Sequence, residues 1–317
     1  MTARPVSVPN PQPVAAGPRP RPRRSTLTAL VLTLRPEQWT KNLLIFAGVV
    51  FSGRLRELAA VGTAVEAFVV FCALSGVVYI FNDLVDRKAD QQHPLKCMRP
   101  LACGELAPVV AMSAGAVLTA AALGAAWFIS PVFLLVSAVY LVLLSLYSAA
   151  LKHVIIVDVL VIAAGFVLRA VAGAVALDVP ISHWLLICTT LLALFLALSK
   201  RRHELTLLGT DAVGHRRSLE DYSPYLLDQM IAVVTASTLV AYTLYTTDAV
   251  TVARLGTNQL GLTIPFVLYG IFRYLYLVHQ RRGGGSPANL LITDRPLLAC
   301  VALWALSVVL ILYFPHG

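Results

Sequence analysis

Long runs of hydrophobic residues alternate with short polar segments along this chain. Each run holds about 20 residues, the length that an α-helix needs to cross the hydrocarbon core of a membrane. The pattern predicts an all-α integral membrane protein, a bundle of nine transmembrane helices. The expected spans lie near residues 27–52, 63–84, 107–128, 132–150, 154–177, 183–200, 228–248, 260–279 and 297–315, and polar residues interrupt the first of them.

The composition supports a membrane protein and excludes a soluble one. Hydrophobic residues make up 58% of the chain and charged residues only 13%, with a mean hydropathy of +0.78. A soluble globular domain carries about twice that share of charge. Residues 1–25 differ, because they are rich in Pro and Arg and lack apolar content. We therefore expect a disordered cytoplasmic tail at 1–25, without the apolar core of a signal peptide, and an intramembrane domain at 26–317.

The distribution of basic residues predicts the orientation of the bundle. If the N-terminus is cytoplasmic, the inner segments hold most of the Lys and Arg residues, and the outer segments hold only Arg54, Arg56 and Arg254. Cytoplasmic loops carry such an excess. We therefore expect a multi-pass protein of the cell membrane with its N-terminus in the cytoplasm. The excess of basic residues in cytoplasmic loops and the binding of anionic ligands then explain the net charge of +9. Nothing indicates nucleic-acid binding.

An acidic strip at the end of the second run is the strongest candidate for chemistry: Asn82-Asp83-Leu-Val-Asp86-Arg-Lys-Ala-Asp90. On a continuous helix, about 100° per residue places Asp86 and Asp90 within roughly 60° of Asp83. Three like charges on one face repel each other unless a cation lies among them. Hard carboxylate oxygens suit Mg²⁺, which commonly carries substrate phosphates.

Two basic residues, Lys96 and Arg99, follow the acidic strip within a few positions. Guanidinium and ammonium groups bind phosphate oxygens, so a basic loop beside an acidic strip fits a Mg²⁺-chelated diphosphate. The alternative is a solvated acidic helix end, which explains the basic loop poorly. The orientation above places this site on the cytoplasmic face.

Polar residues inside the first span form a second candidate, in Arg35-Pro36-Glu-Gln-Trp39-Thr-Lys41-Asn42. Cations within a bilayer are costly and usually functional, so Arg35 and Lys41 are candidates for holding phosphate oxygens. The proline can bend the helix into a cavity. The alternative is an interfacial lead-in, with Trp39 in the aromatic belt.

A third cluster surrounds the turn between the fourth and fifth spans. Tyr147 and Lys152 precede Asp158, which we expect one turn inside the fifth span. An intramembrane carboxylate needs a metal or a partner, and an ion pair with a loop cation is the alternative to a ligand role. Arg169 lies about 16 Å deeper on nearly the same face, where it could bind a ligand or pair with Glu66 of the second span.

Lys200 and Arg201 form a fourth cluster, in a loop that we expect to follow the sixth span. They are candidates for phosphate binding, although the excess of positive charge in cytoplasmic loops would account for them alone.

These motifs together resemble the UbiA superfamily of intramembrane prenyltransferases, whose nine helices surround a central cavity and whose second helix ends in a similar acidic motif. The segment from Tyr147 to Asp158 departs from the pattern of members with aromatic acceptors, which carry a second acidic cluster there. It is similar instead to the branch that transfers phosphoribose to decaprenyl phosphate. Three further segments resemble motifs of the same branch: Arg35-Pro-Glu-Gln-Trp-Thr-Lys41-Asn42, His93-Pro-Leu-Lys96-Cys-Met-Arg99-Pro100 and Lys200-Arg201-Arg-His-Glu204-Leu205.

The resemblance implies an enzyme that transfers 5-phosphoribosyl from phosphoribosyl pyrophosphate to a polyprenyl phosphate, with release of pyrophosphate. This is an early step in making decaprenyl-phosphoryl-arabinose for cell-wall arabinan. The resemblance also implies a Mg²⁺ ion held by Asp83, Asp86 and Asp90. A homo-oligomer is compatible with it. The catalytic residues would be Asp83, Asp86 and Asp158, and the substrate-binding residues Arg35, Lys41, Asn42, Asn82, Lys96, Arg99, Tyr147, Lys152, Lys200 and Arg201.

Two other functions compete with this interpretation. A UbiA-type prenyltransferase that joins a polyprenyl diphosphate to an aromatic acceptor would use the same acidic strip. A transporter or lipid flippase without chemistry would explain the intramembrane charges as a transport path. The missing second acidic cluster argues against the first, and the absence of a clear inverted repeat argues against the second.

Overall fold

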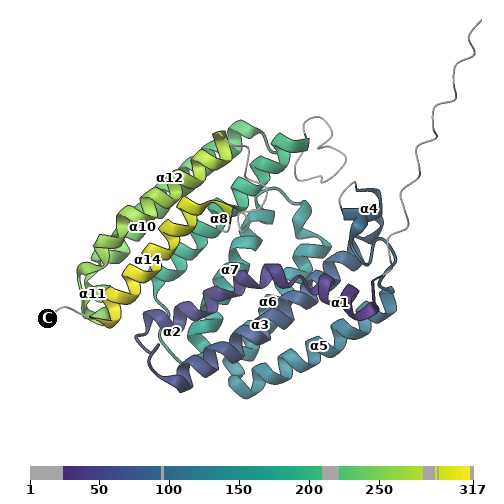
Figure 1. Cartoon of the computed structure of the whole chain (residues 1–317), viewed down its shortest axis with the longest axis horizontal. Coiled ribbons are helices and arrows are strands. Elements are labelled where there is room, and N and C mark those ends of the chain that lie inside the picture. The colour runs from purple at the N-terminus through teal and green to yellow at the C-terminus, as the bar shows by residue number, and fades with distance from the viewer. Residues whose placement is uncertain (1–23, 94–95, 209–220, 281–289, 291–292, 315–317) are drawn as a thin grey trace, which may run out of the picture.

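A computed structural model describes residues 24–93, 96–208, 221–280, 290 and 293–314, and every regular element within them is a helix (Figure 1). The predicted tail at 1–25 lies almost wholly outside these residues. Eight of the described helices are long and apolar enough to cross a membrane. They are α3 (Leu58–Val85), α5 (Pro108–Ile129), α6 (Pro131–Ala149), α7 (Val157–Ala176), α8 (His183–Leu208), α10 (Pro224–Thr247), α12 (Ile264–Gln280) with the preceding turn η5 (Gln259–Thr263), and α14 (Arg295–Tyr313).

The predicted first span is not a continuous helix, so the described residues contain eight such helices and not nine. It consists of α1 (Thr26–Leu34), the 3₁₀ segment η1 (Pro36–Phe46) and the short α2 (Ala47–Phe51). The break has a local cause. Arg35 adopts a left-handed conformation with φ of 52°, and the proline that follows has no N–H for an α-helical hydrogen bond.

This broken segment nevertheless runs the length of the bundle beside α3. At one end Ala29 packs with Ile80, near the end of α3, and at the other Val49 packs with Ala60, near its beginning. The short helices mark the two ends (Figure 1): α4 (Arg87–Gln92) lies at one, and α11 (Ala249–Leu255) lies at the other. We call them the α4 end and the α11 end.

Small residues allow the broken segment to lie directly on α7. A Cβ atom added to Gly173 would lie 2.0 Å from the carbonyl oxygen of Ile45, and one added to Gly48 would lie 2.7 Å from the carbonyl oxygen of Gly173. Glycine is therefore required at both positions for this backbone contact. The contact fixes the depth of η1, which carries several of the candidate residues.

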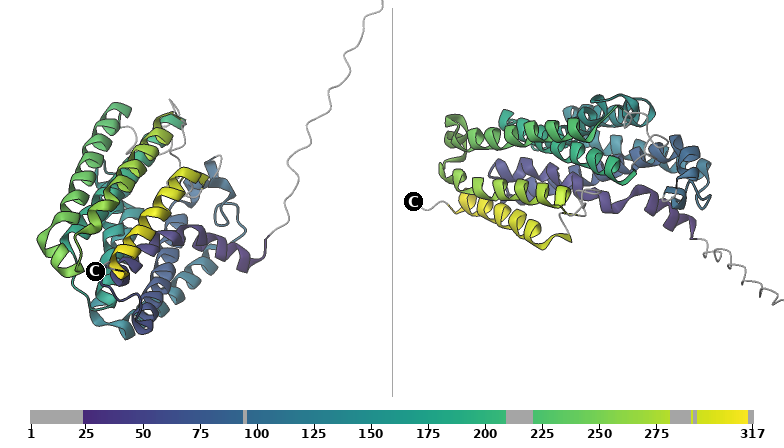
Figure 2. Two further views of the ribbon diagram at one scale, coloured as in Figure 1. Left: turned by 60° about the vertical axis from the view of Figure 1, so that its left-hand side comes forward. Right: turned by 90° about the horizontal axis from the view of Figure 1, so that it is seen from above.

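Two apolar clusters form the core on either side of α7. One joins α3, α5 and α6 around Phe71, Phe133 and Tyr140. The other joins α8, α10, α12 and α14 around Phe195 and Tyr274. Figure 2 shows the helices of each group lying side by side along the bundle. Elements from both groups therefore contribute side chains to the α4 end.

Candidate functional site

A network of ion pairs at the α4 end brings together the acidic strip and the basic residues predicted beside it. Arg35 Nη2 lies 2.5 Å from Asp83 Oδ1, and Arg99 Nη1 lies 3.1 Å from the same oxygen. The same Arg99 nitrogen lies 2.5 Å from Asp90 Oδ2. Both carboxylates are nearly inaccessible, whereas the two arginine side chains are 21% and 23% exposed. The arginines can therefore be reached from outside the network.

The predicted three-carboxylate metal site is not assembled among the described residues, which contain no group of three acidic or other ligating side chains close enough for a metal. Asp83 and Asp90 converge on Arg99, but Asp86 turns to Lys152, which comes from the 3₁₀ turn η3 (Leu151–His153). Carboxylates gathered at low exposure need counter-charges, and here side-chain cations supply them.

Two carboxylates still fit the requirements of Mg²⁺. This ion is usually bound through one or two carboxylates together with substrate phosphates and waters. The Arg99 nitrogen between Asp83 and Asp90 stands where a bridging cation would satisfy both groups. Burial raises the pKa of the Asp90 carboxyl, while Arg99 offsets part of that effect. A cation near this pair would favour its ionised form further.

A second network, centred on Arg201, is buried more deeply. Arg201 Nε lies 2.8 Å from Asp158 Oδ2, with side-chain exposures of 2% and 0%. A second guanidinium nitrogen pairs with Glu204, and the third donates to Tyr147 Oη at 3.3 Å. Tyr222 donates to Asp158 Oδ1 at 3.0 Å and accepts from the backbone N–H of Ile156. The structure therefore gives Asp158 the ion pair that was the alternative to a ligand role.

Arg201 lies on α8, which is longer than predicted, and from this helix it reaches Asp158. The sequence predicts a loop after residue 200, but the helix continues to Leu208. Lys, Arg, His and Glu at 200–204 are compatible with a helix, and the chain extends it beyond its apolar part. Lys200 and Arg201 therefore lie on a helix. Lys200 is exposed, 4.0 Å from Glu204, and Arg201 points inward.

A third buried cluster links the broken segment to α7. Arg169 Nε donates to Asn42 Oδ1 at 2.7 Å, and Nη2 donates to Tyr140 Oη at 2.7 Å. The Asn42 amide in turn donates to Ser75 Oγ at 3.2 Å. The pairing of Arg169 with Glu66 was wrong, because Glu66 is exposed on another face of α3. Helical rise predicts depth but not which way each side chain faces.

Among the described residues, the charged groups that act most strongly on Lys41, beside Asn42, are the cations Lys200, Arg169 and Arg35. Among the residues that the structure describes, no acceptor contacts its ammonium group. On the same segment, the indole N–H of Trp39 is buried without a partner in the described chain. Buried donors normally find acceptors, so this part of η1 is suited to an anion.

The remaining predicted residues lie at the same end. Asn82 is half-buried on the last turn of α3, and Lys96 is exposed in the short 3₁₀ turn η2 (Lys96–Met98). Tyr140, Glu204 and Tyr222 were not predicted as site residues. Tyr222 is the least foreseeable, because it reaches Asp158 from 64 positions away without a local motif. Burial raises the pKa of Tyr222 to about 12, so it remains a hydrogen-bond donor at neutral pH.

Known proteins are similar to this chain in sequence and in fold. The chain is 32% identical to decaprenyl-phosphate phosphoribosyltransferase of Mycolicibacterium smegmatis, over 92% of this chain and 94% of that protein. It is 30% identical to the protein of the same name from Corynebacterium glutamicum, over 90% and 86% of the two chains. A solved UbiA homologue from Archaeoglobus fulgidus, bound to DMAPP and Mg²⁺, has the same fold, with a TM-score of 0.69 at 19% identity over 91% of this chain and 100% of that one. The model of the UbiA prenyltransferase family matches residues 42–292, and the chain therefore belongs to that family.

Proposed function

We propose that this protein transfers 5-phosphoribosyl from phosphoribosyl pyrophosphate to a polyprenyl phosphate, decaprenyl phosphate by analogy with its relatives, and releases pyrophosphate. The observation that carries the proposal is the arrangement at the α4 end. Two carboxylates share Arg99, and Lys41, on the η1 segment that follows Arg35, has no acceptor among the described residues. Such a site suits two phosphorylated substrates, one held with a metal and one held by cations alone.

The first network is our proposed donor site. Asp83 and Asp90 would hold Mg²⁺ together with the diphosphate of the donor, and Asp86 would take part through its pair with Lys152. When bound, Mg²⁺ would neutralise the charge that develops on the departing pyrophosphate. Arg35 and Arg99 would then exchange a carboxylate oxygen for a phosphate oxygen, which their partial exposure allows.

The segment around Lys41 is our proposed acceptor site. The ammonium group of Lys41 and the indole N–H of Trp39 would bind the acceptor phosphate, whose lipid chain enters from the bilayer. We assign Asn42 to positioning, because its side chain is fully buried and already bound to Arg169 and Ser75. Lys96 and Lys200, both exposed at this end, would guide the anionic substrates toward it.

The proposed reaction needs little proton transfer. An acceptor phosphate oxygen, already anionic, attacks C1 of the phosphoribosyl group, and the bond from C1 to the pyrophosphate oxygen breaks. Charge passes to pyrophosphate, so electrostatic stabilisation of that group is the main catalytic requirement. The product would be a polyprenyl-phosphoribose suited to arabinan precursor synthesis, made at a cytoplasmic site in the cell membrane.

One observation bears on the rival prenyltransferase. The second network has two carboxylates, but Asp158 and Glu204 are both bound to the same buried arginine. A second metal–diphosphate site would have to break the pair of Arg201 with Asp158, which is almost inaccessible, and breaking such a pair is costly. The geometry therefore favours a single metal site and the phosphoribosyl donor.

The test uses purified protein in detergent with labelled phosphoribosyl pyrophosphate, decaprenyl phosphate and Mg²⁺. We expect a labelled lipid that disappears with chelator. A parallel reaction supplies a polyprenyl diphosphate and an aromatic acid. Product in that reaction alone would replace the proposal with the rival function.

A further inference from the structure

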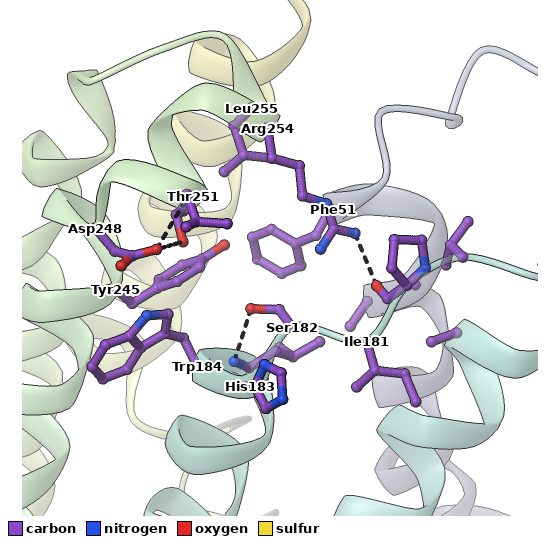
Figure 3. A pocket seen from close by; sticks show the side chains of 17 residues that line it. Phe51, Ile181, Ser182, His183, Trp184, Tyr245, Asp248, Thr251, Arg254 and Leu255 are labelled. Carbon is purple, nitrogen blue, oxygen red and sulfur yellow. Dashed lines mark hydrogen bonds between the residues drawn. The ribbon is translucent and has the colours of Figure 1, made fainter.

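A cavity of about 530 Å³ lies at the α11 end, opposite the ion-pair network. Its wall is formed by α2, by the connection between α7 and α8, and by α10 and α11 (Figure 3). Phe51, Ile181 and Tyr245 converge on it, and the rings of Phe51 and Tyr245 lie 6.4 Å apart. Cavities of about 300–1,000 Å³ with mainly apolar walls are typical of ligand sites.

The charged side chains in the wall, Asp248 and Arg254, are both bound by the protein itself. Asp248 caps α11, accepting from the backbone N–H of Thr251 at 2.9 Å and from its hydroxyl at 3.0 Å. Arg254 donates to the carbonyl oxygen of Pro180 at 3.0 Å. The cavity therefore offers aromatic and aliphatic surface without demanding a charged ligand, which favours a hydrocarbon occupant.

The broken segment connects this cavity with the proposed acceptor site. Lys41 lies on η1, and Ala47, six positions later, already lines the cavity. A 3₁₀ rise of about 2 Å per residue makes that separation about 12 Å. Between them the side chain of Leu43 is 55% exposed and offers apolar surface on the same segment. A lipid whose phosphate binds at Lys41 would reach the cavity after its first isoprenoid units.

We propose that this cavity binds distal isoprenoid units of the acceptor lipid and sets the chain length that the enzyme prefers, an inference that rests on the proposed function. Short acceptors occupy only the region around Lys41. Longer acceptors gain the additional burial of their apolar surface in the cavity, so affinity increases with chain length until the cavity is filled.

The test compares a series of polyprenyl phosphates, from geranyl to decaprenyl, in the wild type and in Ile181→Trp. The larger side chain would fill the cavity from a connecting segment outside the helices. Leu262→Trp is the matched control, because it replaces another aliphatic side chain with tryptophan at the same end of the bundle, on η5, where Leu262 is 67% exposed and does not line the cavity. Phe51→Ala provides the opposite change by enlarging the cavity.

We expect the wild-type kcat/KM to increase with chain length. Ile181→Trp would lower it roughly tenfold for long acceptors, the effect of losing a few buried methylene groups, and leave it unchanged for the shortest acceptor used by the wild type. Phe51→Ala would move the preference toward longer chains. A flat wild-type profile would overturn the inference, and so would an equal loss at every length, or no loss at any length, in Ile181→Trp. No loss at any length is expected if bilayer lipid fills the cavity instead of the acceptor. No product with any polyprenyl phosphate would instead refute the proposed function.

Discussion

Two arginine-centred networks lie at the same end of the bundle, yet they differ in accessibility and in the partners that hold them. Arg99 bridges Asp83 and Asp90 with its side chain 23% exposed, and it comes from a short connecting segment. Arg201 lies on a long helix, is 2% exposed, and binds Asp158, Glu204 and Tyr147 together. A partly exposed ion pair can exchange a partner for a ligand, whereas a dry and fully bonded one holds elements in place. We therefore assign chemistry to the first network and positioning to the second.

The largest expected effect is on stability, in the Arg201 network. Asp158→Asn leaves the size of the side chain unchanged but removes a charge from a pair that is almost inaccessible. Breaking such a pair from one side costs about 3–5 kcal/mol. Thermal unfolding in detergent should show a clear decrease in Tm. An unchanged Tm would mean that Asp158 is not a structural partner of Arg201.

The next effect is on activity, in the Arg99 network. Asp83→Asn should lower phosphoribosyl transfer by about a hundredfold or more, because it removes a charge from the proposed metal and diphosphate site. The Tm should change little, since Arg35 and Arg99 can turn toward solvent. Initial rates at saturating Mg²⁺ measure this effect. A large fall in Tm with retained activity would reverse the assignment.

Arg99→Lys tests what the guanidinium contributes. Lysine keeps the charge but cannot bind two acceptors in one plane, so we expect KM for phosphoribosyl pyrophosphate to increase about tenfold. The matched change at another partly exposed arginine, Arg202→Lys, leaves this network intact, because Arg202 pairs with Asp228. Equal kinetic effects of the two substitutions would argue against a specific role for Arg99.

A further effect on stability concerns Tyr222. Tyr222→Phe removes the hydroxyl that donates to Asp158 and accepts from Ile156, but leaves the ring in place. Loss of these hydrogen bonds should lower the free energy of unfolding by about 1–3 kcal/mol. Denaturation monitored by circular dichroism would measure it. We expect KM for both substrates to remain unchanged, and a selective change in either one would place Tyr222 in the binding site.

The sequence predicts eight of the helices close to where they lie, apart from the C-terminal end of α8, because apolar runs of membrane length leave little choice of structure. It was less successful wherever side-chain direction decides the result. The charges at 200–204 predict the end of an apolar run, but the helix continues through them. On a continuous helix Asp83, Asp86 and Asp90 would share one face, but α3 ends at Val85 and α4 begins at Arg87, and cations from other segments separate Asp86 from the rest. Such partners come from distant parts of the chain, so local periodicity cannot predict them.

The assignment of chemistry to the Arg99 network and of positioning to the Arg201 network is tested most directly by two substitutions, Asp83→Asn and Asp158→Asn. Labelled-lipid formation and Tm are measured for both in parallel. We expect Asp83→Asn to lose transfer activity with a Tm near that of the wild type, and Asp158→Asn to have a lowered Tm. Retained transfer by Asp83→Asn, together with an unchanged Tm and lost transfer in Asp158→Asn, would contradict this assignment and place the chemistry at the Arg201 network.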